Sequence, residues 1–153
     1  MSALPQTRTA YQLMREEDLA AVASIEERIY EFPWTQGNFL DSLRAGYTCW
    51  LCHGAQDLVG YAVLMNASDE VHLLNLSIAG HYQRQGYGAR MLEFLIADAR
   101  AAKSGKIILE VRPSNDAGRR LYANFGFRQL GIRRNYYPAA AGREDALVLA
   151  LDL

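Results

Sequence analysis

The segment Gln83-Arg84-Gln85-Gly86-Tyr87-Gly88 follows a strand-like run, Val71–Ile78, and precedes a helix-like one. Its two glycines let backbone N–H groups turn toward one point without interference from a Cβ. The positive end of the following helix adds about half a unit charge, so the segment predicts a cradle for a pyrophosphate. Arg84 can add a full positive charge. A glycine turn that only joins a strand to a helix is the alternative.

The spacing of these glycines excludes two common nucleotide-binding loops. A dinucleotide fingerprint needs a third glycine, and Met91 stands at that position. A Walker loop needs a lysine directly after its last glycine, and none is present. The sequence therefore predicts an anion site of another kind.

Strand-like and helix-like runs on both sides of this segment predict a mixed α/β fold. The runs Cys49–His53, Val59–Met65 and Val71–Ile78 are separated by turn residues, which predicts an antiparallel meander. Helical spacing marks an apolar face downstream of the glycines, formed by Met91, Leu92, Leu95, Ile96 and Ala99. The strand-like run Ile107–Val111 then completes a right-handed crossover between two parallel strands.

The remaining elements complete this prediction. Thr35 is placed to cap a short helix that runs to Leu43. Phe127–Ile132 and Ala146–Leu151 are the last two strands, joined by a loop that contains tyrosines and glycine. We expect one domain over residues 1–153, with a mixed, mostly antiparallel sheet, one parallel βαβ crossover and flanking helices.

Composition and charge argue against two classes of binding partner, nucleic acids and membranes. The chain has 153 residues, 22% of them charged, and a net charge of −1, so no global basic field favours nucleic acid. No apolar run reaches the length of about 18 residues that a membrane-spanning helix needs. The N-terminus lacks a charged-then-apolar signal pattern. We expect a cytoplasmic protein that contacts neither nucleic acid nor a membrane.

Cysteines and histidines do not predict a metal centre. Cys49 and Cys52 form a C-x-x-C pair, but they fall on a predicted strand, where residues three apart point to opposite faces. No second pair completes a zinc site. His53, His72 and His81 lack the spacing of metal ligands and are interpreted as surface or strand residues.

Two motifs resemble those of the GCN5-related N-acetyltransferase (GNAT) superfamily. The first is Gln83-x-x-Gly86-x-Gly88, and the second is Asn115 with Leu121-Tyr122 and Phe125-Gly126-Phe127. Further stretches look like the bacterial RimI type, namely Phe32-Pro33-Trp34, Leu109-Glu110-Val111-Arg112, Arg133-Arg134-Asn135-Tyr136-Tyr137-Pro138 and Gly142-Arg143-Glu144-Asp145-Ala146. The similarity extends from about Met14 to Leu151.

The resemblance implies acetyl-CoA as the co-substrate. Backbone groups of Leu76, Ser77 and Ile78 would contact its pantetheine arm, and an N–H near Ile78 would polarise the acetyl carbonyl. Asn115 would hydrogen-bond the same molecule. The backbone of six residues would hold the pyrophosphate: Arg84, Gln85, Gly86, Tyr87, Gly88 and Ala89.

The resemblance also implies two catalytic residues, Glu110 as the base and Tyr122 as the acid facing the sulfur. Glu110 falls on an apolar strand, so we expect desolvation to raise the pKa of its carboxyl toward neutrality. An ion pair with Arg112, or with another basic group, is the alternative. A phenol is less acidic than a thiol by about 1.5 pKa units, so Tyr122 can stabilise the leaving thiolate without full proton transfer. Core packing is the alternative for this tyrosine.

The acceptor that the RimI type implies is the N-terminal alanine of the eighteenth protein of the small ribosomal subunit. Phe32 and Trp34 would form an apolar wall for the peptide, and Tyr136 and Tyr137 would contact it from the last loop. Packing of Trp34 and of one tyrosine in the core is the alternative. Arg133-Arg134 is interpreted as a small solvated basic patch.

Proton affinity favours the same acceptor. Deprotonating an α-amine at pH 7 costs about 1.4 kcal/mol, whereas a lysine side chain costs about 4.6 kcal/mol. Two other hypotheses stay open, a broader N-terminal or lysine acetyltransferase of the same fold and a non-catalytic subunit that binds acetyl-CoA. Retention of both Glu110 and Tyr122 counts against the second.

Overall fold

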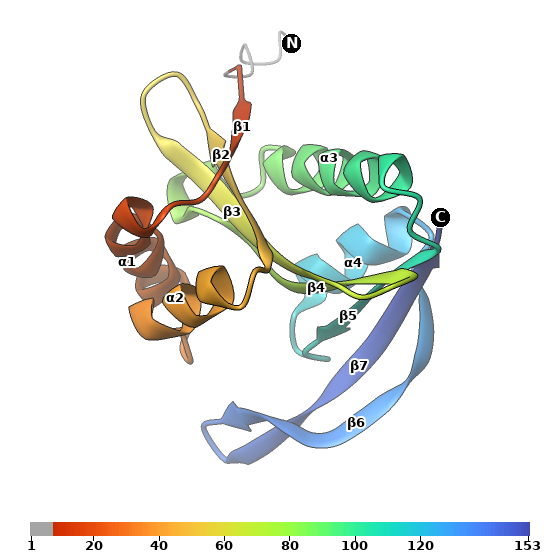
Figure 1. Cartoon of the computed structure of the whole chain (residues 1–153). Helices are drawn as coiled ribbons and strands as arrows, with labels where there is room; N and C mark the ends of the chain where they lie inside the picture. The colour runs from red at the N-terminus through yellow and green to blue at the C-terminus, as the bar shows by residue number, and fades with distance from the viewer. Residues whose placement is uncertain (1–7) are drawn as a thin grey trace, which may run out of the picture. The chain divides into compact units, whose positions relative to one another are not determined.

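The computed structural model describes residues 8–153. Residues 1–7, part of the N-terminus that lacks a signal pattern, lie outside the described part. Within it the chain forms seven strands and four α-helices (Figure 1). They are β1 (Ala10–Leu13), α1 (Leu19–Ile29), α2 (Gln36–Arg44), β2 (Thr48–His53), β3 (Leu58–Asn66), β4 (Glu70–Ile78), α3 (Tyr87–Ala101), β5 (Lys106–Val111), α4 (Asp116–Asn124), β6 (Arg128–Ala139) and β7 (Gly142–Asp152). Two short 3-10 helices, Glu16–Asp18 and Gly80–Tyr82, precede α1 and the glycine segment.

The strands pair in the order β1-β2-β3-β4-β5-β7-β6. β4 and β5 are parallel, with Val71 opposite Ile107, and α3 makes the crossover between them. The pairs β1–β2, β5–β7 and β6–β7 are antiparallel. The predicted mixed sheet with one parallel crossover is confirmed.

The chain divides into two compact units. The N-terminal unit comprises the residues up to Val63 together with Asn75–Tyr87, and the C-terminal unit comprises Leu64–Leu74 and Gly88–Leu153. In the N-terminal unit, α1 and α2 lie together beside β2 (Figure 1). The Thr35 hydroxyl accepts the Asn38 N–H at 3.1 Å, so the predicted helix cap is confirmed. Fully buried side chains of this unit are Val22, Phe39, Leu51, Val59 and Tyr61.

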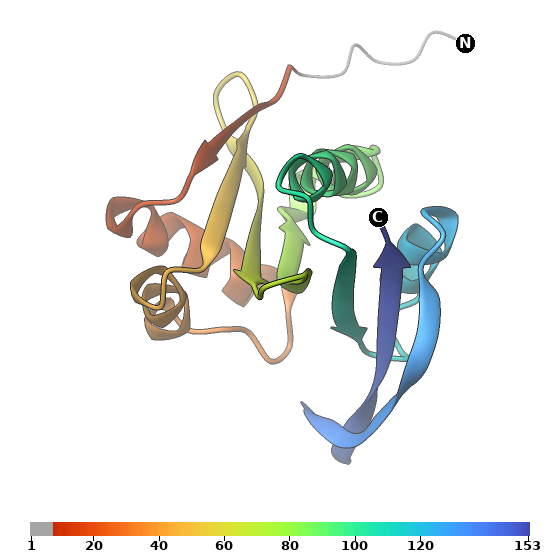
Figure 2. The same cartoon turned by 45° about the vertical axis from the view of Figure 1, so that its right-hand side comes forward.

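In the C-terminal unit, β5, β7 and β6 lie side by side, and β6 and β7 form a long curved hairpin (Figure 2). All five residues of the predicted apolar face of α3 are buried. On β5 the odd-numbered residues Ile107, Leu109 and Val111 are buried, as expected for a strand whose side chains alternate between two faces.

The β6–β7 hairpin is longer than predicted. We expected the two strands to span 127–132 and 146–151, whereas the ladder continues to the pair Ala139–Gly142. The turn between the strands therefore falls on residues 140–141, within the small-residue tract. Tyr136 and Tyr137 lie on β6 itself, so their assignment to a loop was wrong.

An irregularity inside β6 explains this difference. The register shifts between Arg133 and Tyr137, and Asn135 takes a left-handed conformation with φ of 51°. At this irregularity, hydrogen bonds from side chains of β7 take the place of the backbone hydrogen bonds between the two strands. Asp145 accepts the Asn135 N–H at 2.9 Å, and Arg143 donates to the Asn135 carbonyl at 2.8 Å. These contacts connect residues that local sequence patterns do not relate.

Cys49 and Cys52 are buried thiols of β2, as predicted. Burial raises the pKa of the Cys49 thiol to about 11, which keeps it protonated and unreactive. Within residues 8–153, no group of three or more His, Cys, Asp or Glu side chains is arranged to hold a metal ion. No helix of this region is both long and apolar enough to cross a membrane.

Candidate active site

The glycine segment forms a tight turn at the start of α3. Gly86 has a φ of 87° and Arg84 a φ of 62°, both in the left-handed region. Only glycine adopts this conformation without steric cost, so the turn explains Gly86. Gly88 instead lies within the first turn of α3.

Two glutamine side chains brace this turn. Gln83 Nε2 donates to the Ile78 carbonyl at 3.0 Å, and Gln85 Nε2 donates to the His81 carbonyl at 2.9 Å. Residues 83–86 are exposed. The tight turn before α3 is thus braced by side chains and open to solvent, as an anion site at a helix start requires. Binding of a pyrophosphate there stays a prediction.

The end of β4 carries the residues predicted to contact the pantetheine arm. The hydroxyl of Ser77 is buried, 2.6 Å from both the Tyr30 hydroxyl and the Asn75 side-chain oxygen. Leu76 and Ile78 are half-buried. The Ile78 carbonyl already accepts one side-chain hydrogen bond, from Gln83.

Glu26 is a buried carboxylate that accepts several hydrogen bonds within the N-terminal unit, a role that was not predicted from the sequence. It is only 2% exposed, and its carboxylate accepts hydrogen bonds from the Tyr61 hydroxyl at 2.7 Å and the Trp34 N–H at 2.9 Å. Asn75 Nδ2 donates to it at 3.2 Å. One signal could have revealed it, because Glu26 stands four residues after Val22 on the apolar face of α1.

The two residues of the predicted peptide wall differ in exposure. Phe32 is 39% exposed. Trp34 is half-buried, and its ring lies 5.2 Å from that of Phe39, which is fully buried. Trp34 therefore packs against the core of its unit, the alternative considered above, while Phe32 presents an apolar surface to solvent.

Glu110 lies in a cluster of three charged or titratable side chains from three strands. Its side chain is 8% exposed. One carboxylate oxygen lies 2.6 Å from Nε2 of His72 on β4, and the other lies 3.2 Å from Nε of Arg133 on β6. His72 and Arg133 were interpreted as strand and surface residues, so their role in this cluster was missed.

The expected rise in the pKa of Glu110 was wrong. Burial does raise the pKa, and it is the largest single influence. The hydrogen bond and charge of His72, together with Arg133, outweigh burial and hold the pKa below the ordinary value for Glu. Glu110 is therefore a carboxylate at neutral pH, stabilised by two basic partners.

Glu110 forms the ion pair given above as the alternative, with Arg133 as the basic group. Arg112 contacts the β6–β7 hairpin. Its guanidinium donates to the Pro138 carbonyl at 2.8 Å and to Glu144 at 3.2 Å, and it lies 4.3 Å from the centre of the Tyr137 ring. Glu144 also accepts the Ser114 N–H at 2.9 Å. These contacts connect the end of β5 to the tip of the β6–β7 hairpin.

The hairpin presents the two predicted peptide-contacting tyrosines differently. Tyr136 is 46% exposed, whereas Tyr137 is half-buried beneath Arg112, and their rings meet edge to face at 4.8 Å. Burial raises the pKa of Tyr137, so its hydroxyl stays protonated. Arg133 and Arg134 are both exposed, and each also pairs with a carboxylate, Arg133 with Glu110 and Arg134 with Asp145.

α4 carries the remaining two predicted residues. Asn115 caps the helix, its side-chain oxygen accepting the Gly118 N–H at 2.9 Å, which leaves Nδ2 as the group suited to donate to a ligand. A Cβ at Gly118 would lie 2.6 Å from that Nδ2, so any larger residue there would displace the Asn115 side chain. Tyr122 is buried and meets Phe127 edge to face at 5.4 Å.

The predicted residues are therefore distributed over both units. The N-terminal unit holds Phe32, Trp34, the end of β4 and the turn up to Tyr87. The C-terminal unit holds Gly88, Ala89 and the other five, which are Glu110, Asn115, Tyr122, Tyr136 and Tyr137. Within the C-terminal unit, Glu110 and Tyr137 are close enough for the carboxylate charge to raise the pKa of the phenol further.

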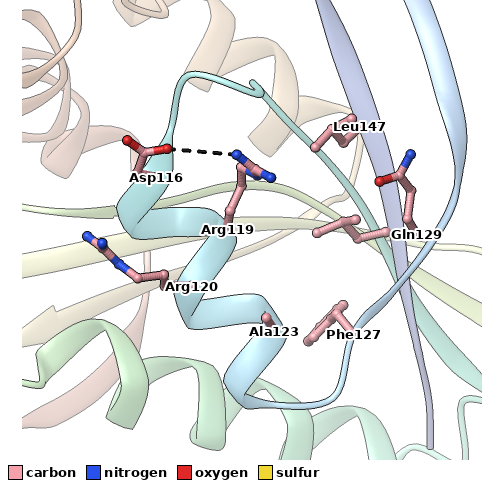
Figure 3. Close-up of a pocket in the computed structure, with 8 residues that line it drawn as sticks. Asp116, Arg119, Arg120, Ala123, Phe127, Gln129 and Leu147 are labelled. Atoms are coloured by element: carbon pink, nitrogen blue, oxygen red, sulfur yellow. Dashed lines mark ion pairs between the residues drawn. The ribbon is translucent and has the colours of Figure 1, made fainter.

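A cavity of about 440 Å³ lies between α4 and the β6–β7 hairpin (Figure 3). It is lined by Asp116, Arg119, Arg120, Ala123, Phe127, Gln129, Leu147 and Leu149. None of these is a predicted site residue. Leu147 and Leu149 pair with Val111 and Leu109, whereas Glu110 alternates with them and faces the other side of the sheet. The cavity is thus separate from the Glu110 cluster.

Comparisons with known proteins identify the family. The sequence matches the Acetyltransferase (GNAT) family over residues 11–127. It is 38% identical to the [ribosomal protein bS18]-alanine N-acetyltransferase of Escherichia coli strain K12 over 136 residues, covering 89% of this chain and 92% of that protein.

Two solved structures share the fold. The crystal structure of the ribosomal-protein-S18-alanine N-acetyltransferase from Escherichia coli matches with a TM-score of 0.89 at 35% identity, covering 95% of this chain and 94% of that one. The structure of yncA from Salmonella typhimurium with its cofactor acetyl-CoA matches with a TM-score of 0.77 at 19% identity, covering 95% and 94%. The second likeness concerns the fold alone. The chain belongs to the GNAT family of acetyltransferases.

Proposed function

We propose that this protein transfers the acetyl group of acetyl-CoA to the N-terminal α-amine, that of alanine, of a ribosomal small-subunit protein in the cytoplasm. The observation that carries this proposal is the 38% identity, over 89% of the chain, to a protein named for that reaction. The matched 136 residues exceed the span of the general family match, 11–127. The likeness to that protein therefore extends over more of the chain than the family match does.

Residues of both units suit acetyl-CoA. The turn around Gly86 offers backbone N–H groups at the start of α3, with Arg84 exposed beside them. Asn115 retains a side-chain N–H donor after capping α4. Acetyl-CoA supplies the activated acetyl group, and the chain supplies donors for its phosphates and amides.

Glu110 and Tyr122 are the proposed catalytic pair. A neutral amine attacks the acetyl carbon directly, so one proton must leave the nitrogen and the departing thiolate must be stabilised. Glu110 is ionised and can receive that proton, directly or through its neighbours. Tyr122 is buried on α4, where its phenol can stabilise the thiolate by a hydrogen bond or give up its proton.

The acceptor would be held by apolar and aromatic side chains. Phe32 and Tyr136 expose ring surface, whereas Trp34 and Tyr137 are half-buried. Arg112 and Glu144 hold the hairpin tip that carries Tyr137. A short apolar peptide N-terminus matches these surfaces better than a long charged lysine stem does.

Mass spectrometry tests this proposal. The protein is incubated with acetyl-CoA and three peptides that share one sequence, starting with alanine, starting with a bulky residue, or blocked at the N-terminus with an internal lysine. We expect the acetyl group on the α-amine of the alanine peptide. Equal modification of the lysine peptide would identify a broader enzyme, and cofactor binding without turnover on any acceptor would identify a non-catalytic subunit.

A further inference from the structure

His72 and Glu110 form a hydrogen-bonded pair within the C-terminal unit. Nε2 of His72 lies 2.6 Å from one Glu110 oxygen. The parallel pairing of β4 with β5 places His72 opposite Ile108, one step along the same face from Glu110. An imidazole with one nitrogen on a carboxylate has its tautomer set, with a proton on that nitrogen and a lone pair on the other.

The two partners differ in access to solvent. The His72 side chain is 24% exposed and that of Glu110 is 8% exposed. Arg133 occupies the second oxygen of Glu110 at 3.2 Å. Both carboxylate oxygens are therefore engaged, whereas Nδ1 of His72 is not used in the bond to Glu110. A proton on the imidazole can pass to water more readily than one on the buried carboxylate.

We propose that His72 is the residue on which the proton of the acceptor amine comes to rest, with Glu110 orienting its ring. The inference rests on the proposed function and refines its mechanism. As the amine nitrogen bonds to the acetyl carbon, the carbon–sulfur bond breaks and the sulfur leaves with that electron pair. The nitrogen loses one proton to Nδ1 of His72, directly or through a water, and the imidazolium later releases it to solvent.

Proton affinity supports this division of roles. The lowered pKa of Glu110 makes it a poor acceptor for a proton from an ammonium group. The same lowered pKa makes it a good partner for an imidazolium, because it stays charged beside it. Imidazole is the side chain whose ordinary titration falls between about pH 5 and pH 8, the range that general-base catalysis near neutrality requires.

Other charged groups share the face of the sheet on which the pair lies. On the same face of β5, Lys106 and Ile108 precede Glu110, and Glu70 lies two residues before His72 on β4. β6 contributes Arg133, and Tyr137 is near enough to sense the Glu110 charge. The face that carries the His72 ring thus holds two cations, Lys106 and Arg133, and two carboxylates, Glu70 and Glu110. Their charges balance, so neither a positive nor a negative potential dominates around the ring.

The substitution His72→Gln separates a proton-accepting role from a structural one. The amide nitrogen of glutamine can still donate to Glu110, but it cannot accept a proton at neutral pH. We expect kcat/KM for the alanine peptide to fall about 100-fold, with an unchanged Kd for acetyl-CoA and unchanged unfolding. The matched control is His53→Gln on β2, which should leave all three measurements as in the wild type.

The pH dependence of kcat/KM gives the sharper readout. If both the amine and the imidazole must be neutral, log kcat/KM rises with a slope of about two between about pH 5 and pH 6. If Glu110 alone is the base, only the amine titrates in this range and the slope is about one. The expected result is a slope near two for the wild type and near one for His72→Gln.

Several outcomes would overturn the proposal. These are a wild-type slope of one, a slope of two that persists in His72→Gln, or full activity of that variant. If His72→Gln unfolds, His72→Ala with added imidazole replaces it, and we expect imidazole but not glycerol to restore turnover. Failure of imidazole to restore turnover there would also overturn it.

The same measurements separate this inference from the proposed function. Turnover on a lysine acceptor with the slopes expected for His72 would retain the inference and overturn the α-amine acceptor. Turnover on the alanine peptide with slopes of one would do the reverse. Absence of turnover on every acceptor would overturn both.

Discussion

Burial and basic neighbours shift the pKa of the Glu110 carboxyl in opposite directions, and only the burial can be predicted from the sequence. The apolar neighbours of Glu110 on β5 are visible in the sequence, and they predict burial and a raised pKa. His72 and Arg133 are far away along the chain, and their charges reverse the shift. A buried carboxylate with two basic partners is better suited to hold charge than to take up protons.

Replacing Glu110 tests its role at the scale of one residue. Glu110→Gln keeps the shape and removes the charge, so we expect kcat to fall about 100-fold or more because the proton acceptor loses its partner. The Kd for acetyl-CoA, measured by calorimetry, should stay within about twofold. The exposed control Glu93→Gln on α3 should change neither value. Equal losses of turnover and binding in Glu110→Gln would make the residue structural.

At the scale of elements, two features combine a helix start with a glycine. α3 begins beside Gly86, which has a left-handed backbone. α4 begins at a cap formed by Asn115, and Gly118 leaves space for that cap. The role of each glycine can be tested by a substitution. The control is the same substitution at a second glycine that has a similar backbone position but lies away from the proposed site.

The Gly118→Ala substitution tests the cap. Alanine favours a helix over glycine by about 1 kcal/mol, but its Cβ would lie 2.6 Å from Asn115 Nδ2 and would displace that side chain. We expect the Kd for acetyl-CoA to rise about tenfold without a matching loss in the free energy of unfolding. The control is Gly37→Ala in α2, where the nearest atom lies at 3.6 Å and binding should be unchanged. Unaltered binding in Gly118→Ala would exclude Asn115 from the cofactor site.

The Gly86→Trp substitution tests the turn before α3. A bulky side chain in this left-handed position blocks the approach of a phosphate to the backbone, so acetyl-CoA binding should be lost. Gly46→Trp is the matched control, because Gly46 has a similar φ of 83° and no neighbour within 4 Å of its Cβ position. Calorimetry should detect normal binding in the control. Normal binding in Gly86→Trp as well would leave the segment a plain turn.

At the scale of the whole molecule, charge is nearly balanced at −1, so acid stability depends on individual carboxylates. The hydrogen bonds of Ser114 lower the pKa of Glu144, with a smaller effect of Arg112. The partners of Glu110 lower its pKa as well. A group whose pKa is lowered on folding stabilises the protein above its unfolded pKa, and this stability is lost as pH falls.

The sign and window of this effect can be measured. The ordinary pKa of a Glu carboxyl is 4.5, so the wild-type free energy of unfolding should decrease as pH falls below about 4.5. In a variant carrying Glu110→Gln and Glu144→Gln, this decrease should be smaller, because neither side chain titrates. Urea unfolding between about pH 3 and pH 7 gives both curves, with Asp98→Asn as an exposed control. Parallel curves for wild type and double variant would contradict the prediction.

Local patterns in the sequence determined which faces of several elements are buried and where helices and turns begin. Periodicity placed the buried faces of α3 and β5, Thr35 marked the start of α2, and Gly86 marked the left-handed turn. These features depend on spacings of a few residues, which the chain satisfies before any tertiary contact forms. The two motifs that resemble GNAT proteins are local in the same sense.

Tertiary structure decided the features that depend on strand pairing. Only the register of β4, β5, β6 and β7 places His72 and Arg133 on Glu110, and only the side-chain contacts at Asn135 extend the β6–β7 hairpin. No periodicity within one strand specifies which residue of another strand will face it. The pKa of Glu110 is therefore a property of the folded sheet, because the basic groups that lower it come from two other strands, β4 and β6.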